Sequence, residues 1–447
     1  MVDKTKPDDL CPDELLLGKP EDELISDEPS GDRVVARCDY LGQSQFSDAD
    51  EFLYRSFLSP AYHRTVEQVA TWMAAAGMAT RIDPAGNLIG RYAGESDGLP
   101  ALMIGSHLDS VRDAGFYDGP LGVMLGIECV DALNRAGKRL PYAIEVIAFG
   151  DEEGSRFPAS MLCSRAVAGT LTDLDLNQAD ALEVTLADAL ADAGLNVDQF
   201  MDARREPDEI IGYLEVHIEQ GPVLESRDLP VGTVTAFAGQ RRYRINATGK
   251  AGHAGTTAMN LRRDAMTAAA EAVLAVENIG VAGPEHLVAT VGSLRPSPGA
   301  INVIPGRVEF TLDIRAADAV TRDNAAREIF DCFDVIGEKR SVAFEVTPLQ
   351  DIAPCPCDPD LMLLLDRSIK QVGVEPMRLV SGAGHDAMSL GGFCPVAMLF
   401  VRCQDGISHN PAEQVSTTDV NVALNVMLQF LNEMAAIPVL KTKAQPQ

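Results

Sequence analysis

The chain has 447 residues, 46% of them hydrophobic and 23% charged, and its formal net charge is −29 at pH 7. A chain of this length and apolar content can form two or three domains with substantial cores. Its negative charge would be repelled by the phosphates of nucleic acids and by anionic membranes, so we expect neither as a partner.

The first 32 residues are acidic and lack an apolar stretch, which predicts a flexible tail rather than a signal peptide. No window of the sequence approaches the roughly 18 apolar residues of a membrane-spanning helix. The nine cysteines are odd in number and scattered, with Cys355 and Cys357 as the only close pair, for which we expect buried thiols. Without an export signal, the reducing cytoplasm is the expected location.

Helical and strand-like segments alternate from residue 33 onward. Helical apolar spacing covers residues 64–78, and residues 80–92 contain two strand-like runs around a Pro-Ala-Gly-Asn turn. Two short apolar runs, at 101–106 and 142–150, flank a buried helix predicted for 121–137. Buried strands that alternate with helices predict an α/β fold with a mostly parallel sheet.

Polar clusters follow directly after both apolar runs. His107 ends the first run, and Asp151, Glu152 and Glu153 follow the second. Open α/β sheets place their functional sites at the carboxyl ends of strands, which is where these clusters fall.

The stretch from residue 237 to 350 differs in composition from its flanks. It holds 13 Lys and Arg residues and 13 Asp and Glu residues, so it is neutral and the whole net charge lies outside it. It also contains strand-like segments interleaved with two helical ones. We therefore predict an inserted domain at 237–350, which divides a main domain into residues 33–236 and 351–447.

The seven histidines are unevenly placed. His63 and His286 have ordinary surroundings, whereas five others lie beside Gly, Asp, Glu or Asn in glycine-rich loops or at strand ends: His107, His217, His253, His385 and His409. A two-metal hydrolase needs a bridging carboxylate, terminal His and Glu ligands, and a free carboxylate as base. Ordinary core histidines and charged turns are the alternative, and both interpretations stay open on these residues alone.

A series of motifs favours the two-metal interpretation, because together the motifs resemble those of one known family. Along residues 33–437 they are similar to the carbamoylase/allantoate amidohydrolase branch of the dinuclear-metal exopeptidase and amidase superfamily. The resemblance implies that the main domain is catalytic and that the inserted domain is a lid and dimerisation domain, a helix-backed antiparallel sheet. The motifs are GSHLDSV, YDGPLGV, DEEGSRF, HIEQGPVLE, GHAGTTAM, INVIPG, LDIRA, SGAGHDA and GISHNPAE.

The same resemblance implies a metal site and a catalytic base. It implies two divalent metal ions, Zn or Mn, with Co or Ni also suited to a His and carboxylate site. Glu152 would be the general base that takes the proton of the attacking water, and Asp109 would orient the imidazole of His107. The implied ligands are His107 and His217 for one metal, Glu153 and His409 for the other, and Asp118 as the bridge.

Further positions match the substrate-binding residues of the family. His253 would stabilise the oxyanion, often across a dimer interface. Asn302 and Arg315 would grip the substrate carboxylate, because an arginine fork matches its two oxygens. Gln220 and His385 match motif positions and either bind substrate or make structural hydrogen bonds.

The implied activity is the metal-dependent cleavage of a ureido C–N bond in a small anionic substrate, by a homodimer formed through the lid. FLSPAYHR (57–64) and FAGQRRY (237–243), with Gln240 and a nearby arginine, favour allantoate as the substrate. N-carbamoyl-L-amino acids and β-ureidopropionate are the alternatives, followed by peptides. A non-catalytic binding protein of the same fold would have lost ligands, and no ligand is missing here.

Overall fold

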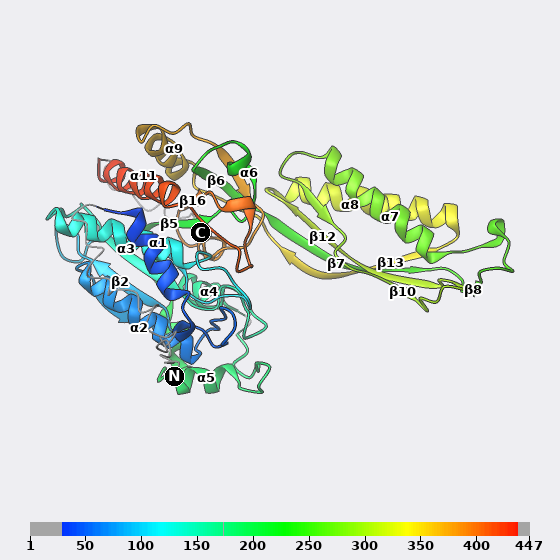
Figure 1. Ribbon diagram of the computed structural model, residues 1–447, viewed down its shortest axis with the longest axis horizontal. Coiled ribbons are helices and arrows are strands. Elements are labelled where there is room, and N and C mark those ends of the chain that lie inside the picture. Colours follow the sequence, from blue (N-terminus) through cyan, green and yellow to red (C-terminus); the bar gives the residue numbers. More distant parts are fainter. Residues whose placement is uncertain (1–28, 173, 437–447) are drawn as a thin grey trace, which may run out of the picture.

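The structure is a computed structural model that describes residues 29–172 and 174–436. It has two parts (Figure 1): a main unit, and an elongated arm formed by residues 239–352. Most of the predicted acidic tail lies outside the described residues. Its last two residues, 31 and 32, belong to helix α1 (Gly31–Leu41), so the tail is shorter than predicted.

The main unit is built on a mixed sheet that has nine strands among the described residues. Its order is β1-β2-β4-β3-β5-β16-β6-β14, with β15 paired to β6. β4, β3, β5 and β16 run parallel at its centre, which confirms the predicted fold class. The strands are β1 (Ala79–Ile82), β2 (Leu88–Tyr92), β3 (Ala101–His107), β4 (Ala143–Phe149), β5 (Ile210–Ile218), β6 (Val231–Phe237), β14 (Cys355–Pro356), β15 (Arg378–Ser381) and β16 (Val396–Val401).

Helices cover both faces of this sheet, so its central strands are buried on both sides. Apolar and polar residues alternate along β5, yet all nine of its residues are buried. Its polar residue Glu215 is fully buried and is satisfied by the backbone N–H of Ala387 and the hydroxyl of Ser106. The helices of the main unit, besides α1, are α2 (Pro60–Ala75), α3 (Pro120–Arg135), α4 (Leu162–Ala168), α5 (Leu186–Asp192), α6 (Val223–Ser226), α9 (Pro359–Gln371), α10 (Asp386–Leu390) and α11 (Thr417–Ala436).

The arm is an antiparallel sheet with two helices on one face (Figure 1). Along β12 every second side chain is buried against those helices, and the intervening residues form the opposite, open face. A short ribbon of β8 and β11 lies at the far end of the arm. The arm contains β7 (Gly239–Thr248), β8 (Gly252–His253), α7 (Ala265–Ala282), β9 (Val288–Thr290), β10 (Leu294–Ser297), β11 (Val303–Ile304), β12 (Arg307–Ala316), α8 (Ala319–Arg340) and β13 (Ala343–Ile352).

Helix α7 overturns one expectation. Among the described helices it alone is long and apolar enough to cross a membrane by length and composition, so the prediction that no segment approaches this size is wrong. Its buried residues include Ala265, Ala268, Ala272 and Val276, which recur every three or four positions. This spacing is typical of a helix that packs one face on a sheet, as α7 does in the arm.

Candidate metal centre

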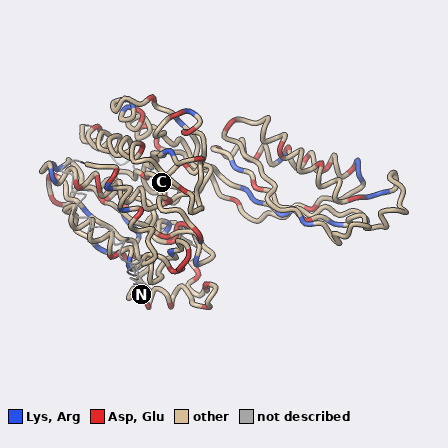
Figure 2. Tube along the Cα trace, viewed as in Figure 1, with Lys and Arg blue, Asp and Glu red and all other residues tan. Residues whose placement is uncertain are grey.

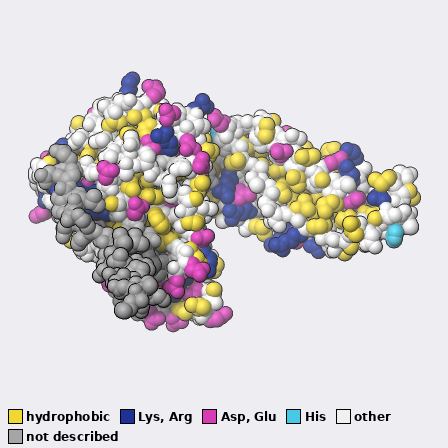
Figure 3. All heavy atoms as spheres, viewed as in Figure 1, with side chains coloured by type: hydrophobic (Ala, Val, Ile, Leu, Met, Phe, Trp, Pro, Cys, Tyr) yellow, Lys and Arg dark blue, Asp and Glu magenta, His cyan; other side chains and the backbone are white. Residues whose placement is uncertain are grey.

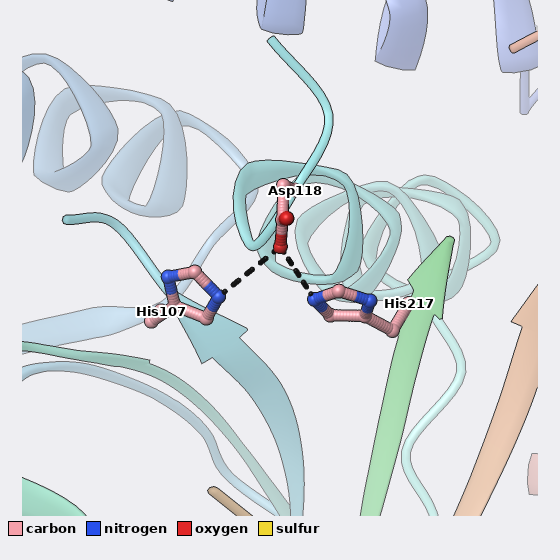
Figure 4. A group of neighbouring side chains, drawn as sticks. All are labelled: His107, Asp118 and His217. Carbon is pink, nitrogen blue, oxygen red and sulfur yellow. Dashed lines mark ion pairs between the residues drawn. The ribbon is translucent and has the colours of Figure 1, made fainter. Parts of the chain in front are cut away.

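Three side chains from different elements converge at the carboxyl end of the central strands. His107 ends β3, His217 lies near the end of β5, and Asp118 lies in the loop before α3. Both imidazoles point at Asp118 (Figure 4): its Oδ1 is 3.5 Å from Nε2 of His107 and 2.9 Å from Nε2 of His217. All three residues are buried.

A second group uses the other oxygen of the same aspartate. Asp118 Oδ2 lies 3.2 Å from Nε2 of His409, and that nitrogen lies 3.4 Å from Oε1 of Glu153. The ligand atoms of each group lie within 4.8 Å of one another. Asp118 therefore stands between two sets of donors, with one oxygen facing each, as a bridging carboxylate would.

The tautomers of the two buried histidines suit a cation. Nδ1 of His107 lies 3.0 Å from the carbonyl of Asp109, and Nδ1 of His217 lies 2.9 Å from the carbonyl of Ile218. Each Nδ1 can donate its proton to that carbonyl, so a cation that displaces the Nε2 proton would meet an Nε2 lone pair on the side of Asp118. Two such nitrogens and a carboxylate are a donor set that divalent zinc accepts.

Electrostatics at the cluster also favour positive charge. Burial lowers the pKa of His107, but its hydrogen bond with Asp118 and the charges of Glu152, Asp109 and Glu153 outweigh burial and raise that pKa well above its usual range. Burial raises the pKa of Asp118, yet its histidine partners hold it well below normal. A bound cation would satisfy the same negative potential.

Glu152 lies beside this cluster. A carboxylate oxygen of Glu152 also lies within 4.8 Å of a ring nitrogen of His107 and a carboxylate oxygen of Glu153. Distance alone therefore does not separate the base from the ligands. Burial raises the pKa of Glu152 well above its usual range. A raised pKa makes an ionised carboxylate a stronger proton acceptor. The role of Glu152 as general base stays a prediction.

The structure gives Asp109 a different contact from the predicted one. Its backbone carbonyl, rather than its carboxylate, makes the close contact with His107, since Oδ1 is 3.6 Å from the ring nitrogen. The carboxylate instead accepts the backbone N–H groups of Glu152 at 3.1 Å and Glu153 at 3.2 Å. Asp109 therefore positions both the histidine and the acidic loop after β4.

Gln220 also has a specific place. Its side-chain amide donates to Asp118 Oδ2 at 2.8 Å, and the hydroxyl of Ser408 donates to the same oxygen at 2.7 Å. Oε1 of Glu413 accepts the backbone N–H groups of Tyr117 and Asp118. The sequence prediction assigned no role to Ser408 or Glu413, although both lie in the GISHNPAE motif that it singled out.

His385 lies behind the candidate metal ligands His107, Asp118 and His217. Its ring packs edge-on against that of His217, with centroids 4.5 Å apart, and its Nε2 is 2.9 Å from the hydroxyl of Ser381. Burial, followed by the charge of His217, lowers the pKa of His385 well below its usual range. A neutral, buried ring in this place supports His217 from behind.

The predicted substrate residues of the arm lie at its two ends. Gln240 and Arg315 are cross-strand neighbours near the main unit, where Nη1 of Arg315 donates to the carbonyl of Gly382 at 2.7 Å. His253 and Asn302 lie at the far tip, on β8 and beside β11 (Figure 1).

This separation corrects one expectation. Arg315 and Arg307 are eight residues apart on β12, which corresponds to roughly 26 Å at about 3.3 Å per residue. Asn302 and His253 lie beyond the Arg307 end of that strand. Within one chain, Asn302 and Arg315 therefore do not meet on one carboxylate, and His253 does not reach the metal cluster.

Comparisons with known proteins identify the family of the chain. The family model described as Peptidase family M20/M25/M40 matches residues 103–433. An N-carbamoyl-L-amino acid amidohydrolase from Geobacillus stearothermophilus is 42% identical over 405 residues, covering 91% of this chain and 98% of the relative. Allantoate deiminase 1 from Glycine max is 39% identical over 435 residues, covering 90% and 89%.

Solved structures give the same assignment. An amidase of the hydantoinase/carbamoylase family from Burkholderia multivorans superposes with a TM-score of 0.85 at 32% identity, covering 93% of this chain and all of that one (100%). A tripeptidase from Staphylococcus aureus, at 14% identity and a TM-score of 0.62, shares the fold. The predicted resemblance is thus confirmed: the chain belongs to peptidase family M20/M25/M40 and is a hydrolase of its amidohydrolase type.

Proposed function

We propose that the protein is an allantoate amidohydrolase, which uses water to convert allantoate to ureidoglycine, ammonia and carbon dioxide. The observation that carries this proposal is the convergence of two donor groups on the two oxygens of Asp118, beside the buried carboxylate of Glu152. This arrangement suits the hydrolysis of an unreactive C–N bond, for which water needs activation.

The donor groups would hold two divalent cations, Zn or Mn, with Co or Ni as alternatives that the same ligands accept. When bound, such cations would polarise the ureido carbonyl and lower the pKa of the attacking water. Glu152 takes the proton of that water and returns it to the leaving nitrogen. Burial raises the pKa of Glu152, which makes its ionised carboxylate a stronger proton acceptor.

The substrate carboxylate would bind at the root of the arm. Arg315 offers a planar guanidinium, and Gln240 and Arg242 lie beside it on the open face of the sheet. Asp313 already accepts from Nε and Nη2 of Arg315, and Gly382 accepts from Nη1, so the remaining Nη hydrogens would be the ones that meet the two oxygens of a carboxylate. Because Arg315 already contacts the loop at Gly382, substrate binding here would draw the arm toward the metal centre.

A second copy of the chain would complete the site. His253 lies too far along the arm to serve its own metal centre, so we propose a homodimer in which each arm tip supplies His253 and Asn302 to the partner. Nδ1 of His253 accepts the backbone N–H of Gly255 at 3.1 Å, which leaves Nε2 as the proton donor. A donor in that position can stabilise an oxyanion.

The allantoate assignment has a specific competitor. The relatives include carbamoyl amino acid hydrolases and allantoate deiminases at similar identity, so their names do not separate the two substrates. Support for allantoate comes from Gln240 and Arg242 side by side, which offer polar contacts for a second ureido group. A cytoplasmic location is proposed as well, because the eight cysteines that the structure describes are free thiols.

The deciding experiment measures ammonia release by the metal-reconstituted protein. Allantoate, an N-carbamoyl-L-amino acid, β-ureidopropionate and a dipeptide are supplied side by side. A clear preference for allantoate supports the proposal. A preference for the carbamoyl amino acid keeps the metal chemistry and replaces the substrate, whereas metal binding without any hydrolysis indicates a non-catalytic protein.

A further inference from the structure

One carboxylate in the arm, that of Asp313, gathers three donors. Its Oδ2 accepts the side-chain amide of Gln240 at 2.8 Å and Nε of Arg242 at 2.9 Å. Arg315 donates two further hydrogen bonds to the same carboxylate, from Nε to Oδ1 at 3.0 Å and from Nη2 to Oδ2 at 3.1 Å. The predictions from sequence named Gln240 and Arg315 but gave Asp313 no role.

The strand register explains why these residues meet. In the β7–β12 ladder, Arg242 pairs with Asp313 and Gln240 pairs with Arg315, so all four lie on the open face. Arg241, the next residue along, points to the helix side and contacts Asp351 and Asp323 there. These contacts identify Arg242 as the arginine that accompanies Gln240.

A cavity of about 540 Å³ lies over this cluster. Its lining includes Arg242, Asp313, Arg315, Thr311 and Gly382. Figure 3 shows basic side chains gathered on the arm close to the main unit. Gly382 is three residues from His385, whose ring contacts His217, so the cavity lies on the side of the arm that adjoins the metal centre.

The charges of the cluster are unequal. Two guanidinium groups face one carboxylate, which leaves a net charge of +1 among Arg242, Arg315 and Asp313. One excess positive charge matches a single substrate carboxylate. Without Asp313 the two guanidiniums would repel each other, lose their common anchor and present two positive charges to the cavity.

We propose that Asp313 is a positioning residue that holds Gln240, Arg242 and Arg315 as one donor surface, and that its charge makes the site select monoanionic over dianionic ureido acids. The proposal rests on the function proposed above, since it concerns the substrate of that site. It adds a specificity rule: acids with a second carboxylate are disfavoured because the cluster offers one net charge.

The test measures binding without turnover. Metal-reconstituted protein carrying Glu152→Gln is titrated calorimetrically with allantoate, a monoanion, and with N-carbamoyl-L-aspartate, a dianion. Adding Asp313→Asn is expected to weaken allantoate binding about tenfold or more, because charged hydrogen bonds are lost. The ratio of dianion to monoanion affinity should rise at least about tenfold, because the cluster then carries two net charges.

A matched control lies on the same strand and face. Glu309→Gln removes one negative charge, whose oxygen lies 3.7 Å from the guanidinium of Arg307, and it leaves the Asp313 cluster untouched. The affinities for allantoate and for N-carbamoyl-L-aspartate should both stay within about twofold of their values without this change. Arg242→Gln lowers the positive charge and should shift the ratio in the opposite direction, which keeps the proposal testable if Asp313→Asn does not fold. Loss of folding alone lowers the active fraction but leaves the affinity ratio unchanged.

The outcomes separate the two proposals. An unchanged ratio in a folded Asp313→Asn protein overturns the role given to Asp313, whether or not overall affinity falls. Failure of the wild-type protein to release ammonia from any ureido acid contradicts the proposed function instead. Calorimetry still measures the binding of the two acids in that case. The proposed preference for monoanions over dianions is therefore tested independently of turnover.

Discussion

Oε1 of Glu413 accepts a hydrogen bond from the backbone N–H of Asp118 at 3.1 Å, although the two residues are 295 positions apart in the sequence. The same oxygen accepts the N–H of Tyr117 at 2.9 Å. The loop that carries Asp118 is thus anchored by the segment that carries His409.

This anchor predicts an effect on metal binding. Replacing Glu413 by Ala leaves two buried N–H groups without an acceptor and frees the loop, so metal affinity should fall about 10- to 100-fold. Glu413→Gln keeps a side-chain oxygen and should lose much less. Calorimetric metal titration of both variants checks this, and wild-type affinity in the Ala variant would show that the anchor is dispensable.

The roles given to the neighbouring glutamates predict opposite defects. Glu152→Gln should keep its bound metal and lower kcat by about 10² to 10⁴, because proton transfer is lost. Glu153→Gln should instead lose metal, since that carboxylate groups with Asp118 and His409. Metal content and ammonia release are measured together for both. Full activity in Glu152→Gln would exclude it as the base.

Close packing at Gly119 predicts a stability effect. Gly119 has φ +87, and an added Cβ would lie 2.6 Å from the ring of His107. Gly119→Ala should therefore lower the melting temperature and weaken metal binding, because it adds a clash with His107 to the strain of a positive φ. Gly137→Ala is the control, as its φ is +61 but nothing lies within 4 Å. Equal metal affinity in the two variants would argue against the clash.

Protonation of His409 predicts a pH dependence of metal binding. Hydrogen bonds with Asp118 and Glu153 raise its pKa from 6.5 to about 10 in the metal-free protein. The stabilisation from its charged form is present below pH 6.5 and is lost as the pH rises through about 10. A metal must displace this proton, so metal affinity should rise from pH 7 to 9. Titrations in buffers of different ionisation enthalpy should detect the released proton, and His409→Gln should release less.

The separation of His253 from its own metal centre predicts complementation. Glu152→Gln and His253→Ala should each be inactive alone. If the two variants are dissociated, mixed and reassociated, roughly a quarter of wild-type activity should return, because half of the proposed homodimers would then hold one intact site. No recovery would mean that His253 acts within its own chain or has no role in the reaction.

Much of the fold is encoded locally. The apolar runs at β3 and β4 and the helix between them follow from periodicity, since burial on both faces demands continuous apolar residues. Figure 2 shows basic and acidic residues along the arm, and their equal numbers over residues 237–350 can be counted from the sequence alone. His107 and Glu152 could be placed near each other because parallel strands end at one edge.

Other relationships depend on contacts that no local pattern encodes. The sequence QRRY does not say which arginine faces Asp313, and a glutamine after β5 does not reveal that it donates to Asp118. Motif order alone also could not show that Asn302 and Arg315 lie at opposite ends of the arm. The residues and motifs of this chain determined its family, its parallel sheet and its candidate ligands. Strand register and long-range packing decided which side chains meet, because these depend on segments far apart in the chain.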